Sequence, residues 1–201
     1  MSSISSCIKL AFASAILAAA TASAATIKID FETMPGADGK FGTADDVAME
    51  STFVTQIRDQ LAPAGLTFTQ GSIMQWSFFN GDEKNHFLSS TSPIGTFSIP
   101  VYGISIESKS YWKATLTAYG ASGNVLAVNT LPSTNGALGL LSVTTTEAIA
   151  SFSILPDSPN LVLNLDNMVL TVSSVPEPST WGMFGAGLAL LGWQRRRTSR
   201  G

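Results

Sequence analysis

The sequence predicts an all-β protein, built as a single antiparallel β-sandwich of jelly-roll type. In the middle of the chain apolar and polar residues alternate, and turn-forming residues interrupt the alternation about every ten residues. About nine short strands result, which is typical of sandwiches and jelly rolls. We expect a signal peptide over residues 1–24, the β domain over 25–174, a C-terminal segment with a short apolar helix over 175–197, and a cytoplasmic end over 198–201.

The predicted strands share a period of two residues, so that one side of each strand is apolar. They cover residues 26–32, 66–69, 97–99, 102–107, 112–119, 125–128, 149–154 and 161–172. Gly, Asn, Ser and Pro predict a hairpin connection at 121–124 and loops at 133–136 and 156–159. One segment differs, because Phe53, Ile57 and Leu61 recur every fourth residue ahead of Pro63. This spacing predicts a short helix over residues 54–61.

Charged residues make up only 12% of the chain, which is about half the usual share. Outward positions of the predicted strands carry Ser, Thr and Asn instead. Between residues 25 and 175 thirteen acidic residues face six basic ones. Because nucleic-acid binding needs a basic surface, we exclude that function class.

The first residues have the composition of a secretory signal peptide. Lys9 precedes an apolar run from Leu10 to Ala20, and Ala22-Ser23-Ala24 ends the segment. The run is short against the ~20 residues that a membrane span needs, so we expect export through the Sec pathway and cleavage after Ala24. The single cysteine, Cys7, leaves with the signal peptide, and the mature chain then has no disulfide to stabilise it.

The C-terminal segment combines a proline-flanked acid, an apolar stretch and a basic cluster. Pro176-Glu177-Pro178 ends the last strand, Trp181 to Trp193 is apolar, and Arg195-Arg196-Arg197 follows. A helix over the apolar stretch is ~20 Å long, against a hydrocarbon core of ~30 Å. Its terminal tryptophans suit the membrane interfaces and its arginines the cytoplasmic side. We therefore expect transient insertion into the inner membrane.

The order of these three features resembles the PEP-CTERM sorting signal of exported Gram-negative proteins. The resemblance implies processing by an exosortase, a membrane-embedded enzyme, in bacteria that make exopolysaccharide. It also implies delivery to the cell surface or to the extracellular biofilm matrix. Residues 176–178 are then the sorting motif and residues 195–197 the sorting basic cluster. A plain C-terminal membrane anchor is the alternative.

Few residues of the mature chain suit catalysis. His86 is its single histidine, no Gly-x-Ser-x-Gly segment accompanies it, and Cys/His spacings for zinc are absent. We therefore predict no enzyme and no catalytic residue. The alternative is a secreted carbohydrate-active enzyme that uses a carboxylate pair, for which the strand glutamates Glu107 and Glu147 are candidates.

Ca²⁺ is the one cofactor that we consider, because carboxylates and carbonyls are its preferred ligands. The first candidate set lies in a glycine-rich loop and comprises Asp38, Asp45 and Asp46. The second set, Asp30, Glu32 and Asp166 with the adjacent Asn167, requires the first and last strands to be neighbours. The starts and ends of these strands resemble galactose-binding-like and carbohydrate-binding jelly rolls, which implies a calcium ion between terminal strands.

Aromatic side chains are the candidates for sugar contact, since exposed rings can stack on sugars. The rings available in the middle of the chain are Trp76, Phe78, Phe79, Tyr102, Tyr111 and Trp112. Most rings of this kind pack in the core, and we take Trp76 and Trp112 as the candidate ligand-binding residues. The resulting hypothesis is an exported, non-catalytic surface or matrix protein that binds exopolysaccharide or a cell-surface glycan.

Overall fold

The computed structural model describes residues 24–49, 54–75 and 86–172. From Ala25 onward these residues belong to one compact unit, residues 25–173. The predicted signal peptide, the sorting segment, the chain end at 198–201 and Trp76 lie outside the described residues. Within the described part, none of the helices has the length and apolar character needed to cross a membrane.

The described residues form twelve strands and one short 3₁₀ helix, so the all-β prediction is confirmed. The strands are β1 (Ala25–Ile29), β2 (Thr33–Met34), β3 (Val47–Ala48), β4 (Val54–Gln56), β5 (Leu66–Gln70), β6 (Ser72–Gln75), β7 (His86–Ser90), β8 (Ile94–Ser108), β9 (Ala114–Tyr119), β10 (Val125–Leu131), β11 (Gly139–Pro156) and β12 (Leu163–Val172), and the helix is η1 (Ala62–Ala64). Ten strands form one large antiparallel sheet, and β2 and β3 form a second, two-stranded sheet.

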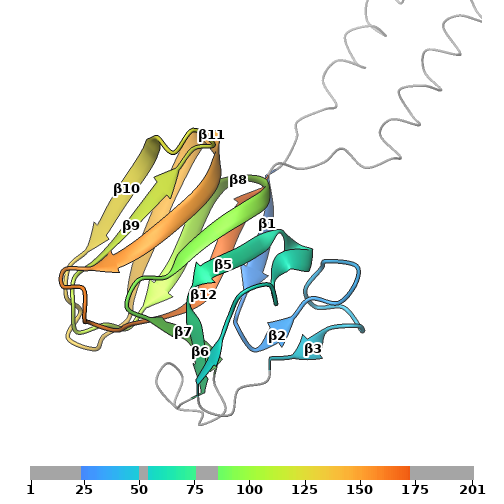
Figure 1. Ribbon diagram of the computed structural model, residues 1–201, viewed down its shortest axis with the longest axis horizontal. Coiled ribbons are helices and arrows are strands. Elements are labelled where there is room, and N and C mark those ends of the chain that lie inside the picture. The colour runs from blue at the N-terminus through green and yellow to red at the C-terminus, as the bar shows by residue number, and fades with distance from the viewer. Residues whose placement is uncertain (1–23, 50–53, 76–85, 173–201) are drawn as a thin grey trace, which may run out of the picture. The chain divides into compact units, whose positions relative to one another are not determined.

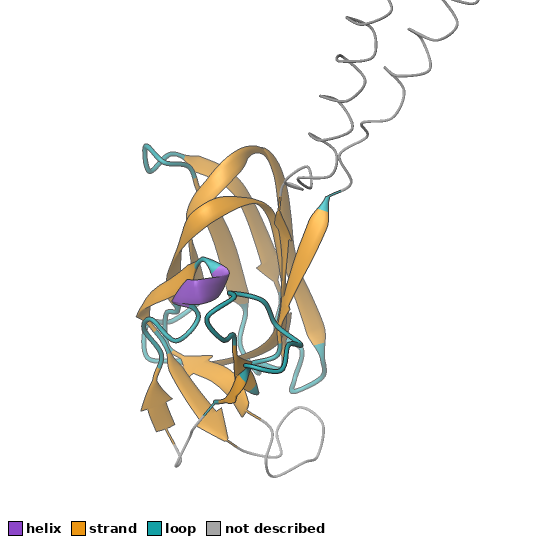
Figure 2. Cartoon of the chain, turned by 90° about the vertical axis from the view of Figure 1, so that its right-hand side faces the viewer, coloured by secondary structure: helices purple, strands orange, loops and turns teal. Residues whose placement is uncertain are grey.

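Two long strands, β8 and β11, hold the large sheet together (Figure 1). Residues 94–97 of β8 pair with β5, whereas residues 101–108 pair with β12. On its other edge β8 pairs with β11, from Gly139 opposite Ser108 to Ser153 opposite Ile94, with register shifts between Thr144 and Ser151, and the far edge of β11 pairs with β9 over 151–156. Because β8 changes partner from β5 to β12 on one edge while β11 stays paired on the other, the sheet is continuous, and its strands curve around a shared interior (Figure 2). The jelly-roll type stays a prediction.

One hydrophobic core lies inside this curved sheet. It includes Ile104 of β8, Leu170 of β12, Leu116 of β9 and Phe152 of β11, each at most 1% exposed. The Phe152 ring packs edge-on against Phe68, with ring centres 6.0 Å apart. Alternation explains these elements, because every second residue of β9 and of the second half of β8 is buried.

The first and last described strands are neighbours, as the second calcium hypothesis requires. β1 pairs with β12 in antiparallel register from Ala25 opposite Val172 to Ile29 opposite Met168. β1 ends at Ile29, earlier than predicted. Phe31, two residues later, is fully buried with a φ of 61°, a left-handed conformation that is uncommon for a residue other than glycine.

The helix predicted over residues 54–61 is wrong. Val54–Gln56 is strand β4 and pairs with β6, and η1 begins only at Ala62. Ile57 and Leu61 are both fully buried. Their four-residue spacing therefore results from burial in the core and not from a helix. The main-chain N–H of Ile57 donates to the carbonyl of Gly71, a partner outside the segment, which a helix would not allow.

Candidate functional site

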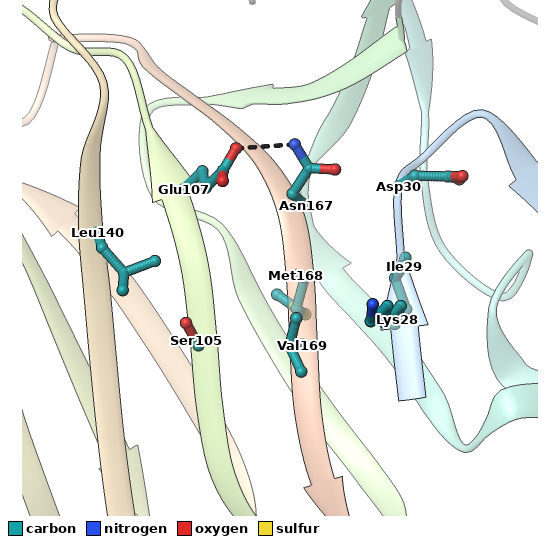
Figure 3. Close-up of a pocket in the computed structure, with 9 residues that line it drawn as sticks. All are labelled: Lys28, Ile29, Asp30, Ser105, Glu107, Leu140, Asn167, Met168 and Val169. Carbon is teal, nitrogen blue, oxygen red and sulfur yellow. Dashed lines mark hydrogen bonds between the residues drawn. The ribbon is translucent and has the colours of Figure 1, made fainter. Parts of the chain in front are cut away.

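A groove of about 460 Å³ lies on the outer face of the sheet, where β1, β12, β8 and β11 run side by side (Figure 3). Its volume falls in the usual range for ligand sites, about 300–1,000 Å³. Its lining residues come from all four strands and are Lys28, Ile29, Asp30, Ser105, Glu107, Leu140, Asn167, Met168 and Val169. Antiparallel pairing brings together these side chains, which are far apart in the sequence.

The register of the four strands sets the positions of the groove residues. Lys28 pairs with Val169, which pairs in turn with Ser105. Glu107, two residues further along β8, pairs with Leu140 of β11. The intervening Ile106 of β8 is fully buried, so Ser105 and Glu107 lie on the outer face.

A bulge in β12 directs the Asn167 side chain into this groove. The pairing of β12 with β8 shifts between Asp166 and Val169, and Asn167 has a φ of 49°. Leu165 and Met168 are both fully buried although they are three residues apart, which regular alternation forbids. The bulge therefore keeps both in the core and leaves Asn167 exposed between them. Such bulges commonly re-aim a side chain next to a binding or active site.

Asn167 and Glu107 form the best-defined polar contact of the groove. The Asn167 Nδ2 donates to Glu107 Oε2 at 2.7 Å, a bond from β12 to β8 that is visible in Figure 3. The main-chain N–H of Asn167 donates to its buried neighbour, Asp166 Oδ1, at 2.7 Å. One bond thus holds the side-chain amide of Asn167 and the other its main chain, and together they orient the side chain before any ligand arrives.

The groove combines hydrogen-bonding groups of several kinds with apolar surface. Asn167 and Ser105 offer neutral donors and acceptors, and Lys28 and Glu107 lie on opposite sides of β12 with opposite charges. Leu140, whose side chain is 56% exposed, adds an apolar patch beside them. This arrangement suits a ligand that carries both hydroxyl groups and apolar C–H surface.

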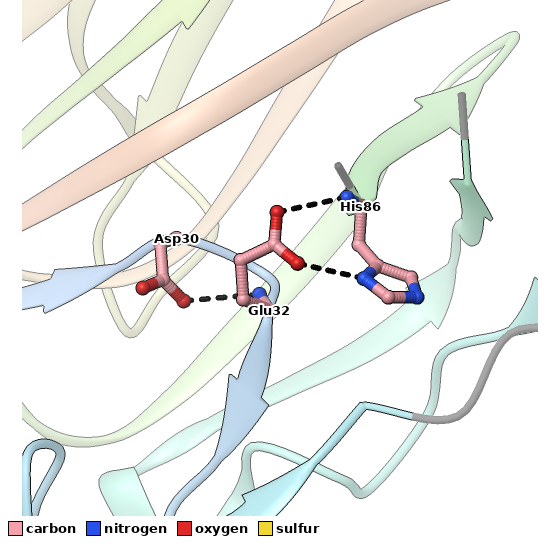
Figure 4. Close-up of polar contacts among 3 residues, drawn as sticks. All are labelled: Asp30, Glu32 and His86. Carbon is pink, nitrogen blue, oxygen red and sulfur yellow. Dashed lines mark hydrogen bonds and ion pairs between the residues drawn. The ribbon is translucent and has the colours of Figure 1, made fainter. Parts of the chain in front are cut away.

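Next to the groove, the turn after β1 holds His86, the first residue of β7 (Figure 4). The Glu32 Oε1 accepts the main-chain N–H of His86 at 2.9 Å, and its Oε2 lies 2.7 Å from the ring Nδ1. Asp30 Oδ1 accepts the N–H of Glu32 at 3.0 Å. The His86 side chain is only 12% exposed. The contacts between Glu32 and His86 join the turn after β1 to the start of β7.

The first calcium set keeps its carboxylates bonded to their own loop. Asp38 Oδ1 accepts the N–H of Lys40, and Asp46 Oδ2 accepts the N–H of Gly42. The Thr43 hydroxyl donates to Asp45 Oδ1 at 2.7 Å, and this bond lowers the pKa of Asp45 below its usual value. In the part of the chain that the structure covers, no three acidic, histidine or cysteine side chains gather as metal ligands do.

The second calcium set is likewise dispersed. Asp166 is buried at 2% exposure, Asp30 is exposed, and Glu32 is engaged by His86. The neighbouring strands are as predicted, but the carboxylates of this set belong to different contacts. Calcium stays a prediction for both sets.

The candidate carboxylate pair for a carbohydrate-active enzyme is widely separated. Glu107 pairs with Leu140, and Glu147 is seven residues further along β11. At ~3.3 Å per strand residue this places the two side chains roughly 20 Å apart, whereas glycosidase carboxylates lie ~5–9.5 Å apart. This pair does not have the geometry for glycoside cleavage.

Of the two tryptophans predicted to bind a ligand, Trp112 is described and is 43% exposed. Asp30, Glu107 and Trp112 were candidates from the sequence, and Asn167 was considered beside Asp166 for calcium, whereas Lys28, Ser105 and Leu140 were not selected as site residues. One signal for Asn167 is present in the sequence. The apolar residues of the last strand change phase across Asp166-Asn167, from odd positions up to Leu165 to even positions from Met168, and such a change indicates a bulge.

Comparison with protein families gives a match for residues 174–197. They match the family described as the PEP-CTERM protein-sorting motif. The chain carries a PEP-CTERM sorting motif. The match confirms the resemblance of residues 175–197, including Pro176-Glu177-Pro178 and the arginine cluster, and a PEP-CTERM motif implies export and sorting to the cell surface by an exosortase.

The β domain itself has only distant similarities. No curated protein sequence matches the chain. A family 29 carbohydrate-binding module, CBM29_1 from Piromyces equi, has 7% identity and a TM-score of 0.40 over 57% of this chain and 85% of its own. The xylan-binding domain CBM22-1 of Paenibacillus barcinonensis Xyn10C has 13% identity and a TM-score of 0.39 over 78% and 100%. The K1 cleaved adhesin domain of Lys-gingipain from Porphyromonas gingivalis W83 has 12% identity and a TM-score of 0.37 over 75% and 99%. TM-scores below 0.5 do not establish a shared fold.

Proposed function

We propose that this chain is an exported, non-catalytic surface protein, sorted by an exosortase, whose β domain binds extracellular polysaccharide through the outer groove. The PEP-CTERM motif at residues 174–197 is the observation that carries the sorting part of this proposal. The groove on β1, β12, β8 and β11 supports the binding part, because its amide, hydroxyl and charged groups lie beside apolar surface. The Asn167–Glu107 bond supports binding further, since it fixes two of these polar groups in place.

The route by which the chain is exported and processed is part of the same proposal. Residues 1–24 direct the chain through the Sec pathway of a Gram-negative bacterium and are removed after Ala24. The apolar stretch from Trp181 to Trp193 then holds the chain in the inner membrane until the exosortase acts at residues 176–178. The protein ends in the extracellular matrix or at the cell surface.

Sorting is tested by producing the full-length chain in a strain with an exosortase and in the same strain without it. We expect processed protein at the surface or in the medium of the first strain and full-length protein in the membrane of the second. Mass spectrometry of the C-terminal peptide distinguishes the two forms. Glu177→Gln should block processing, and the matched control Glu147→Gln should not. A protein that still ends at Gly201 in both strains would overturn the sorting proposal and leave the plain membrane anchor.

Binding is tested separately with exopolysaccharide isolated from the same host. We expect the full-length protein to be retained on this polymer, and Asn167→Gly to reduce the retention by about tenfold, as loss of a central contact does. Retention that is equal for the wild type, Asn167→Gly and Glu147→Gln would contradict binding through the groove.

A further inference from the structure

We propose that Tyr111 and Trp112 extend the groove into a longer binding track for a neutral polysaccharide chain. This inference rests on the proposed function and adds a second, aromatic part to the same site. It also specifies the ligand class. The ligand is an uncharged polymer that occupies the groove together with the loop after β8, residues 109–113, which carries Tyr111 and Trp112 and is called the aromatic loop below.

The aromatic loop directly continues the groove along two paired strands. Glu107 of β8 is opposite Leu140 of β11. Tyr111 follows four residues after Glu107, and Gly136 precedes Leu140 by four residues. These two residues are again in contact, because a Cβ at Gly136 would lie 2.8 Å from the Tyr111 ring Cζ. The Tyr111–Gly136 contact therefore lies beyond the last pair of the two strands, Ser108 opposite Gly139.

Gly136 is required at this position for two reasons. Its φ of 80° is a conformation that glycine adopts readily and other residues adopt at a cost. Any side chain there would also displace the Tyr111 ring. Glycine at position 136 therefore lets the Tyr111 ring lie against the loop backbone.

Hydrogen bonds fix the loop that carries both rings. The Ser133 hydroxyl donates to the Tyr111 carbonyl at 2.6 Å, and the Thr134 hydroxyl donates to the Ser110 carbonyl at 2.7 Å. The main-chain N–H of Trp112 donates to Ser110 Oγ at 3.1 Å. Because the loop is already ordered, a ligand that binds there meets a smaller entropy cost.

Both rings are available to a ligand. Tyr111 is 58% exposed and Trp112 is 43% exposed, although aromatic rings are usually mostly buried. Tyrosine and tryptophan offer large contact areas at a low entropy cost because they have few rotatable bonds. The polar Ser133 and Asn135 lie in the loop that holds Tyr111. Apolar rings beside hydroxyl and amide groups suit the mixed surface of a sugar.

The charges along the track favour a neutral ligand. In the groove Lys28 balances Glu107, and the Asp30 carboxylate points away from the Glu107–Asn167 pair (Figure 3). Beside the aromatic loop, Lys113 and Asp157 are joined through their main chains and again carry opposite charges. With Lys109, two residues before Tyr111, the track carries three basic side chains (Lys28, Lys109 and Lys113) and three acidic ones (Asp30, Glu107 and Asp157), so it has no net positive charge that would attract a polyuronate.

The length of the track favours a polymer. The four-residue step from Leu140 to Gly136 lengthens the site by at most about 13 Å beyond the groove. A single sugar ring can therefore contact the groove or the aromatic loop, whereas a chain of several sugars can contact both. Affinity should consequently rise with chain length, as it does when two sites are linked.

The test measures binding of the full-length protein to host exopolysaccharide, separated by ion exchange into neutral and acidic fractions. Each fraction is used as intact polymer and as fragments of one or two sugars. We expect Trp112→Ala and Tyr111→Ala to weaken binding of the neutral polymer by about tenfold and to leave fragment binding in the groove unchanged. The matched control is Leu155→Ala, which shortens another exposed apolar residue, 45% exposed on β11.

The outcomes separate this inference from the proposed function. Loss of polymer binding with Asn167→Gly but not with Trp112→Ala or Tyr111→Ala supports the groove alone and overturns the aromatic extension. Binding confined to the acidic fraction overturns the neutral ligand class. Absence of any binding by the wild type overturns polysaccharide binding as a whole. Near-wild-type melting temperatures of the variants establish that a loss of binding is not a loss of folding.

Discussion

Glu32 holds two groups of His86 at once. Its Oε1 accepts the main-chain N–H at 2.9 Å, and its Oε2 lies 2.7 Å from the ring Nδ1. The two residues are 54 positions apart in the sequence, so this contact fastens the turn after β1 to the start of β7. β7 pairs with β12, and β12 pairs with β1. The contact therefore links the end of β1 to β7, two strands that both pair with β12 beside the groove.

Loss of this contact should destabilise the domain. Glu32→Ala leaves the main-chain N–H and the ring of a largely buried histidine without this acceptor, and we expect the free energy of unfolding to fall by about 1–3 kcal/mol. Urea denaturation measures this change. Glu147→Ala removes an exposed glutamate and should alter the stability by less than about 0.5 kcal/mol. Equal midpoints for the two variants would contradict a structural role for Glu32.

The bulge at Asn167 makes a second prediction. Both Asn167→Gly and Asn167→Ala remove the bond to Glu107, but only alanine must adopt an unfavourable φ near 49°. We expect Asn167→Ala to be about 1 kcal/mol less stable than Asn167→Gly. Thermal unfolding of the two variants, compared with the wild type, gives this difference directly. If alanine is the more stable of the two, the left-handed conformation of residue 167 is wrong.

Gly95 is the glycine for which we expect the largest cost in the core. A Cβ at this position would lie 2.4 Å from the Phe152 ring, and this ring also stacks on Phe97 with centres 5.5 Å apart. Gly95→Ala should cost about 1–3 kcal/mol because the ring has to move. Gly123→Ala is the control: nothing lies near its Cβ and only its φ of 79° is unfavourable, so about 1 kcal/mol is expected. Calorimetry of both variants ranks them.

The Thr43–Asp45 bond makes a prediction about pH. The Thr43 hydroxyl holds the pKa of Asp45 below its ordinary value, so ionised Asp45 favours the folded loop. This stabilisation is present above the ordinary pKa and is lost as the pH falls through the lowered one. Thr43→Val should return the pKa of Asp45 to its usual range, as measured by carboxyl NMR titration. Thr69→Val, whose hydroxyl donates to the Ile94 carbonyl, should leave the Asp45 titration unchanged.

Calcium binding at either acidic set predicts a higher melting temperature in millimolar calcium than in chelator, because a ligand that binds the folded state stabilises it. Asp46→Asn should reduce the shift if the loop is the site, and Asp166→Asn if the terminal strands are. A melting temperature that is the same in both solutions would contradict both sets.

The alternation of residues predicted the class of the fold and most of its long strands. It failed where strands are short or carry few alternating residues. β4, β6 and β7 have three to five residues each, and their formation depends on partners distant in sequence. The apolar spacing of Ile57 and Leu61 predicted a helix because burial in a loop and in a helix can produce the same pattern.

The groove was less predictable than the fold. Asp30 and Glu107 were recognised as outward residues of strands, but their neighbours across the sheet follow from strand order and register, which alternation does not determine. Lys28 and Leu140 meet the same groove only because β12 and β8 lie between their strands. The sorting motif, in contrast, was recognised directly, because its three parts are contiguous in the sequence.

The pairing of Ala25 with Val172 fixes where the domain is held and where it can reach. Both ends of the described domain meet at one pole of the β1–β12 pair, whereas Asn167 and the loop after β8 lie toward the opposite pole, roughly 20 Å away. A chain fastened beyond residue 172 thus has its aromatic loop at the pole remote from its attachment, and the groove runs from Lys28 and Val169 toward that pole. Tension between an attached tail and a bound polymer would run lengthwise along β12, where many hydrogen bonds have to break together.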